Sequence, residues 1–141
     1  MKIKAATFIR QAAVMSGLAI LFTSVAAQVV TAPSKLSGRW TTVDGAASQS
    51  ISANIDAATS KGTLTVWSSS SDCTIRDAPI AVTSTGEKLI MKVDPSYSNP
   101  CRSEVSVELT KKADSDDYEG ELRQGGRAGA RFPILRVKMS P

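Results

Sequence analysis

The sequence predicts an all-β domain of about eight short antiparallel strands that close into an up-and-down barrel, with a β-sandwich as the alternative. Three observations predict this class. Apolar and polar residues alternate in short segments, turn-forming residues separate these segments at intervals of roughly 8 to 12 residues, and no segment after the first 27 residues keeps an apolar period of 3.6. The barrel is favoured because consecutive strands usually pair and because closure leaves no exposed edge.

The first four expected strands each end at a turn or a polar loop. The first ends at Asp44-Gly45, the second alternates cleanly between apolar and polar residues, and the third is β-branched and aromatic. The fourth contains Pro79, which lacks a backbone N–H, so we expect two short pieces or an edge strand there. These four strands cover 36–43, 48–55, 63–67 and 73–83.

The last four expected strands also carry an alternating pattern. The fifth follows the turn at Thr85-Gly86-Glu87, and the sixth has the clearest alternation of the chain. A glycine-rich hairpin tip separates the last two strands. These four strands cover 89–93, 104–110, 118–123 and 132–139.

The first 27 residues have the pattern of a secretory signal peptide. A short basic segment precedes an apolar stretch at 12–22, and Val25-Ala26-Ala27 supplies the small residues that a signal peptidase needs. We expect cleavage after Ala27, a flexible leader at 28–35, and a single domain at 36–141 in the periplasm or outside the cell.

An uncleaved membrane anchor is the alternative for this segment, because no charge occurs between Arg10 and Lys35. Polar residues in the second half of that run favour the signal peptide. We therefore expect no stable membrane span after cleavage.

The net charge of +4 belongs largely to the expected signal peptide. Three of the 17 basic residues lie there, so 14 basic and 13 acidic residues remain, and we expect no nucleic-acid partner. Four arginines follow the last acidic residue. They form either a basic patch for an acidic partner or an exposed strand face that pairs with the preceding acidic strand, which we favour. They are Arg123, Arg127, Arg131 and Arg136.

Cys73 and Cys101 are the only cysteines, and we expect them to form a disulfide in an oxidising compartment. Two free thiols are the alternative. A redox pair more often shows C-x-x-C spacing, which is absent here.

The chain has no histidine, which excludes Ser-His-Asp and Cys-His catalysis and histidine-ligated zinc. A carboxylate pair is the remaining enzymatic option, but the acidic residues sit in turns or at exposed strand positions. We therefore expect no enzyme, no catalytic residue, no cofactor and no metal. The candidate carboxylates for such a pair are Asp94, Glu104, Glu108, Asp116 and Asp117.

Leu36-Ser37-Gly38-Arg39-Trp40 resembles the Gly-x-Trp opening of calycin-like barrels: lipocalins, avidins and periplasmic inhibitors of serralysin-type metalloproteases. The resemblance implies that Trp40 plugs one end of the barrel and that Arg131 or Arg136 covers its ring. The inhibitors share the Leu-Ser-Gly-x-Trp opening, but their cysteines lie nearer the first strand. Avidins line their pocket with several tryptophans, whereas this chain has two. A β-strand that merely carries Gly and Trp is the alternative.

The sequence predicts a secreted, non-enzymatic binding protein that holds a small apolar ligand or part of an envelope or secreted protein. A filled core would count against the small-ligand version. A protease or other hydrolase inhibitor whose leader enters the target's cleft is one alternative. A structural or stress-related envelope protein is the other.

Overall fold

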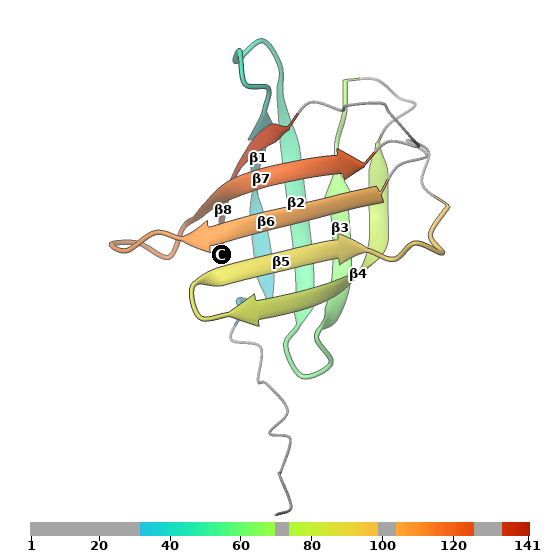
Figure 1. Cartoon of the computed structure of the whole chain (residues 1–141), viewed down its shortest axis with the longest axis vertical. Coiled ribbons are helices and arrows are strands. Elements are labelled where there is room, and N and C mark those ends of the chain that lie inside the picture. Colours follow the sequence, from blue (N-terminus) through green and yellow to red (C-terminus); the bar gives the residue numbers. More distant parts are fainter. Residues whose placement is uncertain (1–31, 70–73, 99–103, 126–133) are drawn as a thin grey trace, which may run out of the picture.

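In the computed structural model, which describes residues 32–69, 74–98, 104–125 and 134–141, eight antiparallel strands close into a barrel. Each strand pairs with its neighbours in sequence, and the last pairs with the first (Figure 1). The prediction of an up-and-down barrel is confirmed. The strands are β1 (Lys35–Thr41), β2 (Ser48–Asp56), β3 (Lys61–Val66), β4 (Ile75–Thr85), β5 (Lys88–Val93), β6 (Glu104–Lys111), β7 (Tyr118–Gly125) and β8 (Leu135–Ser140).

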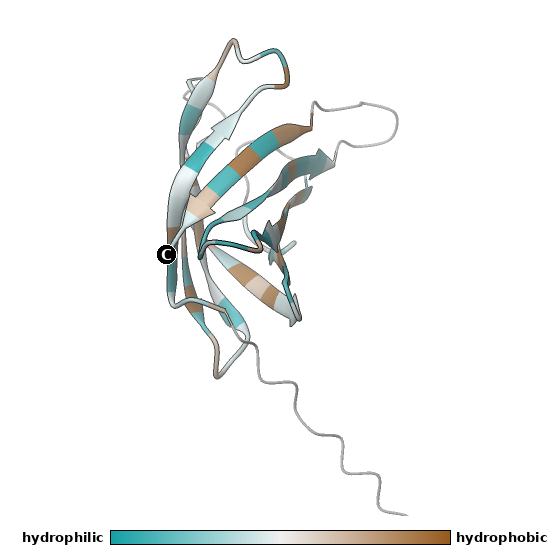
Figure 2. Ribbon diagram, turned by 90° about the vertical axis from the view of Figure 1, so that its left-hand side faces the viewer, coloured by the Kyte–Doolittle hydropathy of each residue, from teal (hydrophilic) through white to brown (hydrophobic). Residues whose placement is uncertain are grey.

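The alternation seen in the sequence becomes an apolar interior and a polar exterior. Along β8 the residues are alternately buried and exposed, and Figure 2 shows polar and apolar residues alternating along the strands. The core draws on every strand, and no polar or charged residue is buried in the described part of the chain. The hydrophobic effect of this interior therefore fixes which face of each strand turns inward.

The expected break at Pro79 is wrong, because β4 runs unbroken through this residue and pairs with strands on both sides. The backbone accommodates Pro79 through an irregularity just before it. Asp77 adopts a φ of 47°, and the register with β3 shifts between Leu64 and Val66. The Pro79 carbonyl still accepts a 2.8 Å hydrogen bond from the Asp94 N–H. Pro79 therefore lacks only the hydrogen bond that a backbone N–H at this position would donate.

Gly38 and Gly120 occupy inward positions where neighbouring strands approach closely. A Cβ on Gly38 would lie 1.9 Å from the carbonyl oxygen of Lys138, and one on Gly120 would lie 1.9 Å from that of Glu108. Glycine at such positions lets the strands bend and coil as a closed barrel requires.

The end of the expected leader is part of the fold. Lys35 already belongs to β1, the Ser34 carbonyl accepts a 2.8 Å hydrogen bond from the Ile55 N–H, and Ala32 packs against the core. Residues 28–31 and the expected signal peptide lie outside the described residues. Within the described ranges, no helix has the length and apolar character to cross a membrane.

Candidate functional site

The interior of the barrel is occupied by the protein's own side chains. Leucine, isoleucine, valine and methionine from all eight strands are buried there, together with Trp40 and Tyr118. An interior filled in this way is a packed core, as small barrels commonly have.

A row of cations crosses the outer face of the sheet at right angles to the strands. Lys61, Ala81, Lys92, Ser106 and Arg123 pair in register from β3 to β7. Adjacent strands lie about 4.8 Å apart, so the three cations alternate with two small residues at intervals of roughly 10 Å. We call these five residues the basic row.

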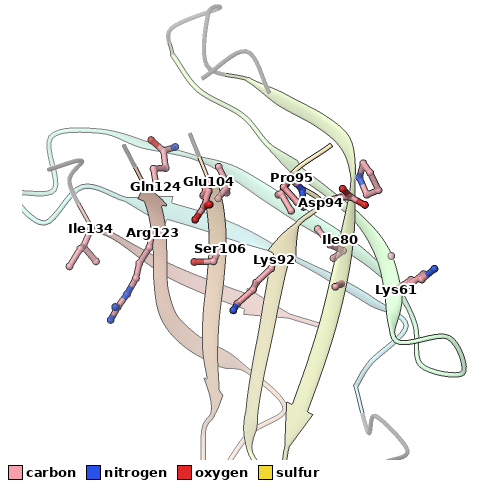
Figure 3. Close-up of a pocket in the computed structure, with 16 residues that line it drawn as sticks. Lys61, Ile80, Lys92, Asp94, Pro95, Glu104, Ser106, Arg123, Gln124 and Ile134 are labelled. Atoms are coloured by element: carbon pink, nitrogen blue, oxygen red, sulfur yellow. The ribbon is translucent and has the colours of Figure 1, made fainter. Parts of the chain in front are cut away.

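A pocket of about 1060 Å³ lies along the basic row (Figure 3). Asp94 and Glu104, each two residues along the chain from Lys92 and Ser106 of the basic row, supply acidic side chains. Ile134, which is 44% exposed, contributes a large apolar side chain at the β8 side. The remaining apolar lining is Pro79, Ile80, Ala81, Val93, Pro95 and Val105.

The charges of this pocket are only partly neutralised by their neighbours. Arg123 Nη2 lies 2.8 Å from Glu121 Oε2, whereas Lys61 and Lys92 form no ion pair within the described part of the chain. The pKa of Asp94 is lowered, chiefly because the Ser96 hydroxyl and N–H donate hydrogen bonds of 2.7 and 2.8 Å to its Oδ1, and further by the charge of Lys61. Asp94 is therefore an anion at neutral pH.

Trp40 and Arg136 do not meet as the resemblance implied. Trp40 is buried, with 6% of its surface exposed, and its Nε1 donates a 2.7 Å hydrogen bond to the Trp67 carbonyl. Arg136 pairs in register with Thr41, the residue after Trp40, and points to the outer face. The cation that does lie over an indole among the described residues is Arg76, whose Cζ is 4.8 Å from the centre of the Trp67 ring.

Of the four arginines proposed as a basic patch, two can be placed. Arg123 contacts Glu121, and Arg136 pairs in register with the same Glu121 on the outer face of β7 and β8. Arg127 and Arg131 lie outside the described residues. The placed arginines therefore flank an acidic strand position.

The other candidate residues either form ion pairs or hydrogen bonds on the surface of the barrel or lie outside the described residues. Glu108 lies 3.5 Å from Lys88, and Asp116 lies 2.8 Å from Lys111. Asp117 Oδ1 accepts a hydrogen bond from Ser140. No group of three or more potential metal ligands occurs in the described ranges, and Cys73 and Cys101 fall outside them.

Sequence reasoning missed the pocket, because its residues come from five strands, β3 to β7, and from the segments after β5 and before β8. The only signal in the sequence was that Lys92 and Arg123 alternate with apolar residues in their expected strands, whereas Lys61 lies outside the expected strand 63–67. The chain matches no family model, and no curated protein and no solved structure matches it.

Proposed function

We propose that this protein is a secreted, non-enzymatic binding protein that recognises a protein partner with the outer face of its barrel. The observation that carries this proposal is the large pocket, whose lining joins the outward cations Lys61, Lys92 and Arg123 to the core residues Ile80 and Val105. A small apolar ligand held within the barrel would have to displace core side chains.

A polypeptide partner suits the chemistry of the pocket. Apolar side chains form much of the lining, and it also carries the cations Lys61, Lys92 and Arg123 and the acids Asp94 and Glu104. Protein interfaces typically combine a central apolar patch with polar and charged residues around it. A segment that carries both signs of charge would complement both the cations and the acids of the pocket.

Site-specific photo-crosslinking tests this proposal. A photoreactive residue at Ser106, between Lys92 and Arg123 of the basic row, should yield a covalent adduct of discrete mass in the native host. Thr110 is the matched control, because it lies on the same face of the same strand but about 13 Å further along it. We expect no adduct at position 110. Equal crosslinking at both positions, or none at Ser106, would contradict the proposal.

A further inference from the structure

Two arginines on the outer face of β1 and β8 lie close together beside a pair of hydroxyl groups. Arg136, Thr41 and Ser48 form one register row across β8, β1 and β2. Arg39 lies two residues before Thr41, on the same outward face of β1. Diagonal neighbours on adjacent strands are about 7 to 8 Å apart, so the guanidinium groups of Arg39 and Arg136 can reach one common point. We call these four residues the arginine cluster.

Hydrogen bonds already fix part of the arginine cluster. Arg39 Nε donates a 3.1 Å bond to Ser48 Oγ, and the Thr41 hydroxyl donates a 3.4 Å bond to the same oxygen. A serine hydroxyl has two acceptor lone pairs and one proton to donate. Both lone pairs of Ser48 are therefore used, and its proton remains for a further acceptor. The Nη groups of Arg39 also remain, since only its Nε bonds to another described residue.

Neither arginine of the cluster is neutralised by an acid within the described part of the chain. None of the ion pairs found there involves Arg39 or Arg136. Arg136 lies beside Glu121 in register, but Glu121 Oε2 accepts hydrogen bonds of 3.1 and 2.8 Å from Nε and Nη2 of Arg123. The nearest carboxylate is therefore held by a different cation, and Arg136 keeps its charge uncompensated.

The other charged groups nearby leave the cluster positive. Lys138 lies directly opposite Arg39 in register, and its Nζ is 3.1 Å from Glu119 Oε1. Asp44, in the turn after β1, accepts a hydrogen bond from the Ala46 N–H and forms no ion pair with a described residue. Like charges directly opposite each other destabilise a sheet, so an anion bound beside Arg39 and Lys138 would relieve their repulsion.

We propose that the arginine cluster binds a phosphate monoester group. The two guanidinium groups come from different strands and, with the Ser48 proton, offer hydrogen bonds from three directions. A phosphate monoester has three acceptor oxygens around one phosphorus atom, whereas one arginine fork already pairs with both oxygens of a carboxylate. The site lies on β1, β2 and β8, apart from the pocket along β3 to β7, and does not rest on the function proposed for that pocket.

Titration with inorganic phosphate at constant ionic strength, followed by NMR signals of the arginine Nε–H groups, tests the proposal. We expect the signals of Arg39 and Arg136 to shift saturably, with half-saturation at roughly millimolar phosphate because the site is open to water. Arg39→Gln and Arg136→Gln should each weaken binding by about tenfold, read from the arginine that remains. Arg76→Gln is the matched control: it also removes an exposed arginine, but one that lies over Trp67, and should leave binding unchanged.

A serine variant separates hydrogen bonding from charge. Ser48→Ala should weaken phosphate binding severalfold without changing the net charge, whereas Ser52→Ala should not weaken it; both serines are half-buried on the same face of β2. Acetate, titrated at mildly acidic pH where both ions carry about one charge, should shift the arginine signals without saturation. Circular dichroism checks that the variants fold.

Two soluble or membrane-bound sources could present such a group, and vesicles distinguish them. Sedimentation with phosphatidylcholine vesicles that contain phosphatidic acid, reversed by inorganic phosphate, would assign the site to a lipid headgroup. Saturable phosphate binding without sedimentation would assign it to a soluble phosphate ester. Absence of saturable binding to both probes would overturn the proposal, as would equal weakening by Arg76→Gln or equal affinity for acetate.

Discussion

At the scale of single residues, the glycine of the Leu-Ser-Gly-Arg-Trp opening has a structural role that the sequence did not reveal. Gly38 faces inward, where the Lys138 carbonyl leaves no room for a Cβ. Trp40, two residues later, occupies the next inward position of β1 and bonds to the Trp67 carbonyl. The motif thus combines a close approach of two strands with a buried indole.

Gly38→Ala should lower the free energy of unfolding by about 2 to 4 kcal/mol, because the backbone of β1 or β8 must move to admit the methyl group. Urea denaturation followed by tryptophan fluorescence would measure this loss. Gly125→Ala is the matched control. Its Cβ would meet no atom nearer than 3.4 Å, so a change within about 0.5 kcal/mol is expected. Equal stability of the two variants would show that the close approach at Gly38 is relieved without cost.

The same scale shows why Arg136 does not cover Trp40. Leu135, Val137 and Met139 are the apolar residues of the last strand, and all three are buried. Side chains alternate along a strand, so an inward Leu135 and Val137 require an outward Arg136. The sequence of β8 therefore already contained the information needed to reject a contact between Arg136 and Trp40, because the alternation of inward and outward residues places Arg136 outside.

At the scale of strands and loops, the predicted disulfide would join the loop before β4 to the loop before β6. Among the described residues, the hydroxyl of Tyr97, which follows β5, donates a 3.0 Å hydrogen bond to the carbonyl of Arg76 in β4. The pairing of Cys73 with Cys101 remains a prediction. Such a bond would close a loop of about 29 residues and should stabilise the fold by roughly 3 to 4 kcal/mol.

Urea denaturation with and without reductant tests this bond. We expect reduction to lower the free energy of unfolding by that amount. A double variant, Cys73→Ala with Cys101→Ala, should match the reduced protein and be insensitive to reductant. Two titratable thiols in the unreduced native protein would contradict the prediction.

Strand identity was predictable from sequence because burial of one face leaves a period of two in each segment. The ends of the strands were less predictable. β1 ends at Thr41, whereas the sequence predicted that it would continue to Val43, which is 63% exposed. Pro79 was misjudged because a local irregularity at Asp77 lets the strand pass through it. The basic row could not be predicted from the sequence. Its alignment depends on the register between five strands, and the pattern within a single strand does not specify that register.

At the scale of the whole molecule, surface charge sets how stability depends on pH. The pKa of Asp116 is lowered by its hydrogen bond and ion pair with Lys111, and that of Glu119 by Lys138 and Lys112. The pKa of Lys111 is raised, chiefly by the hydrogen bond to Asp116. The depressed acids stabilise the fold above their ordinary values of 3.8 and 4.5, and this contribution is lost as pH falls through their native values. The raised lysine stabilises below its ordinary value of 10.5 and ceases to do so as pH rises through its native value.

No histidine titrates between these limits. We therefore expect the urea midpoint to be nearly constant from about pH 5.5 to 8.5 and to decline on both sides. Glu119→Gln should lower the plateau and weaken the decline in acid, because it removes the carboxylate that Lys112 and Lys138 share. Asp114→Asn is a suitable control, since the structure gives Asp114 no ion pair with another described residue. A steep change of the wild-type midpoint between pH 6 and 7.5 would mean that some other group controls the stability of the barrel.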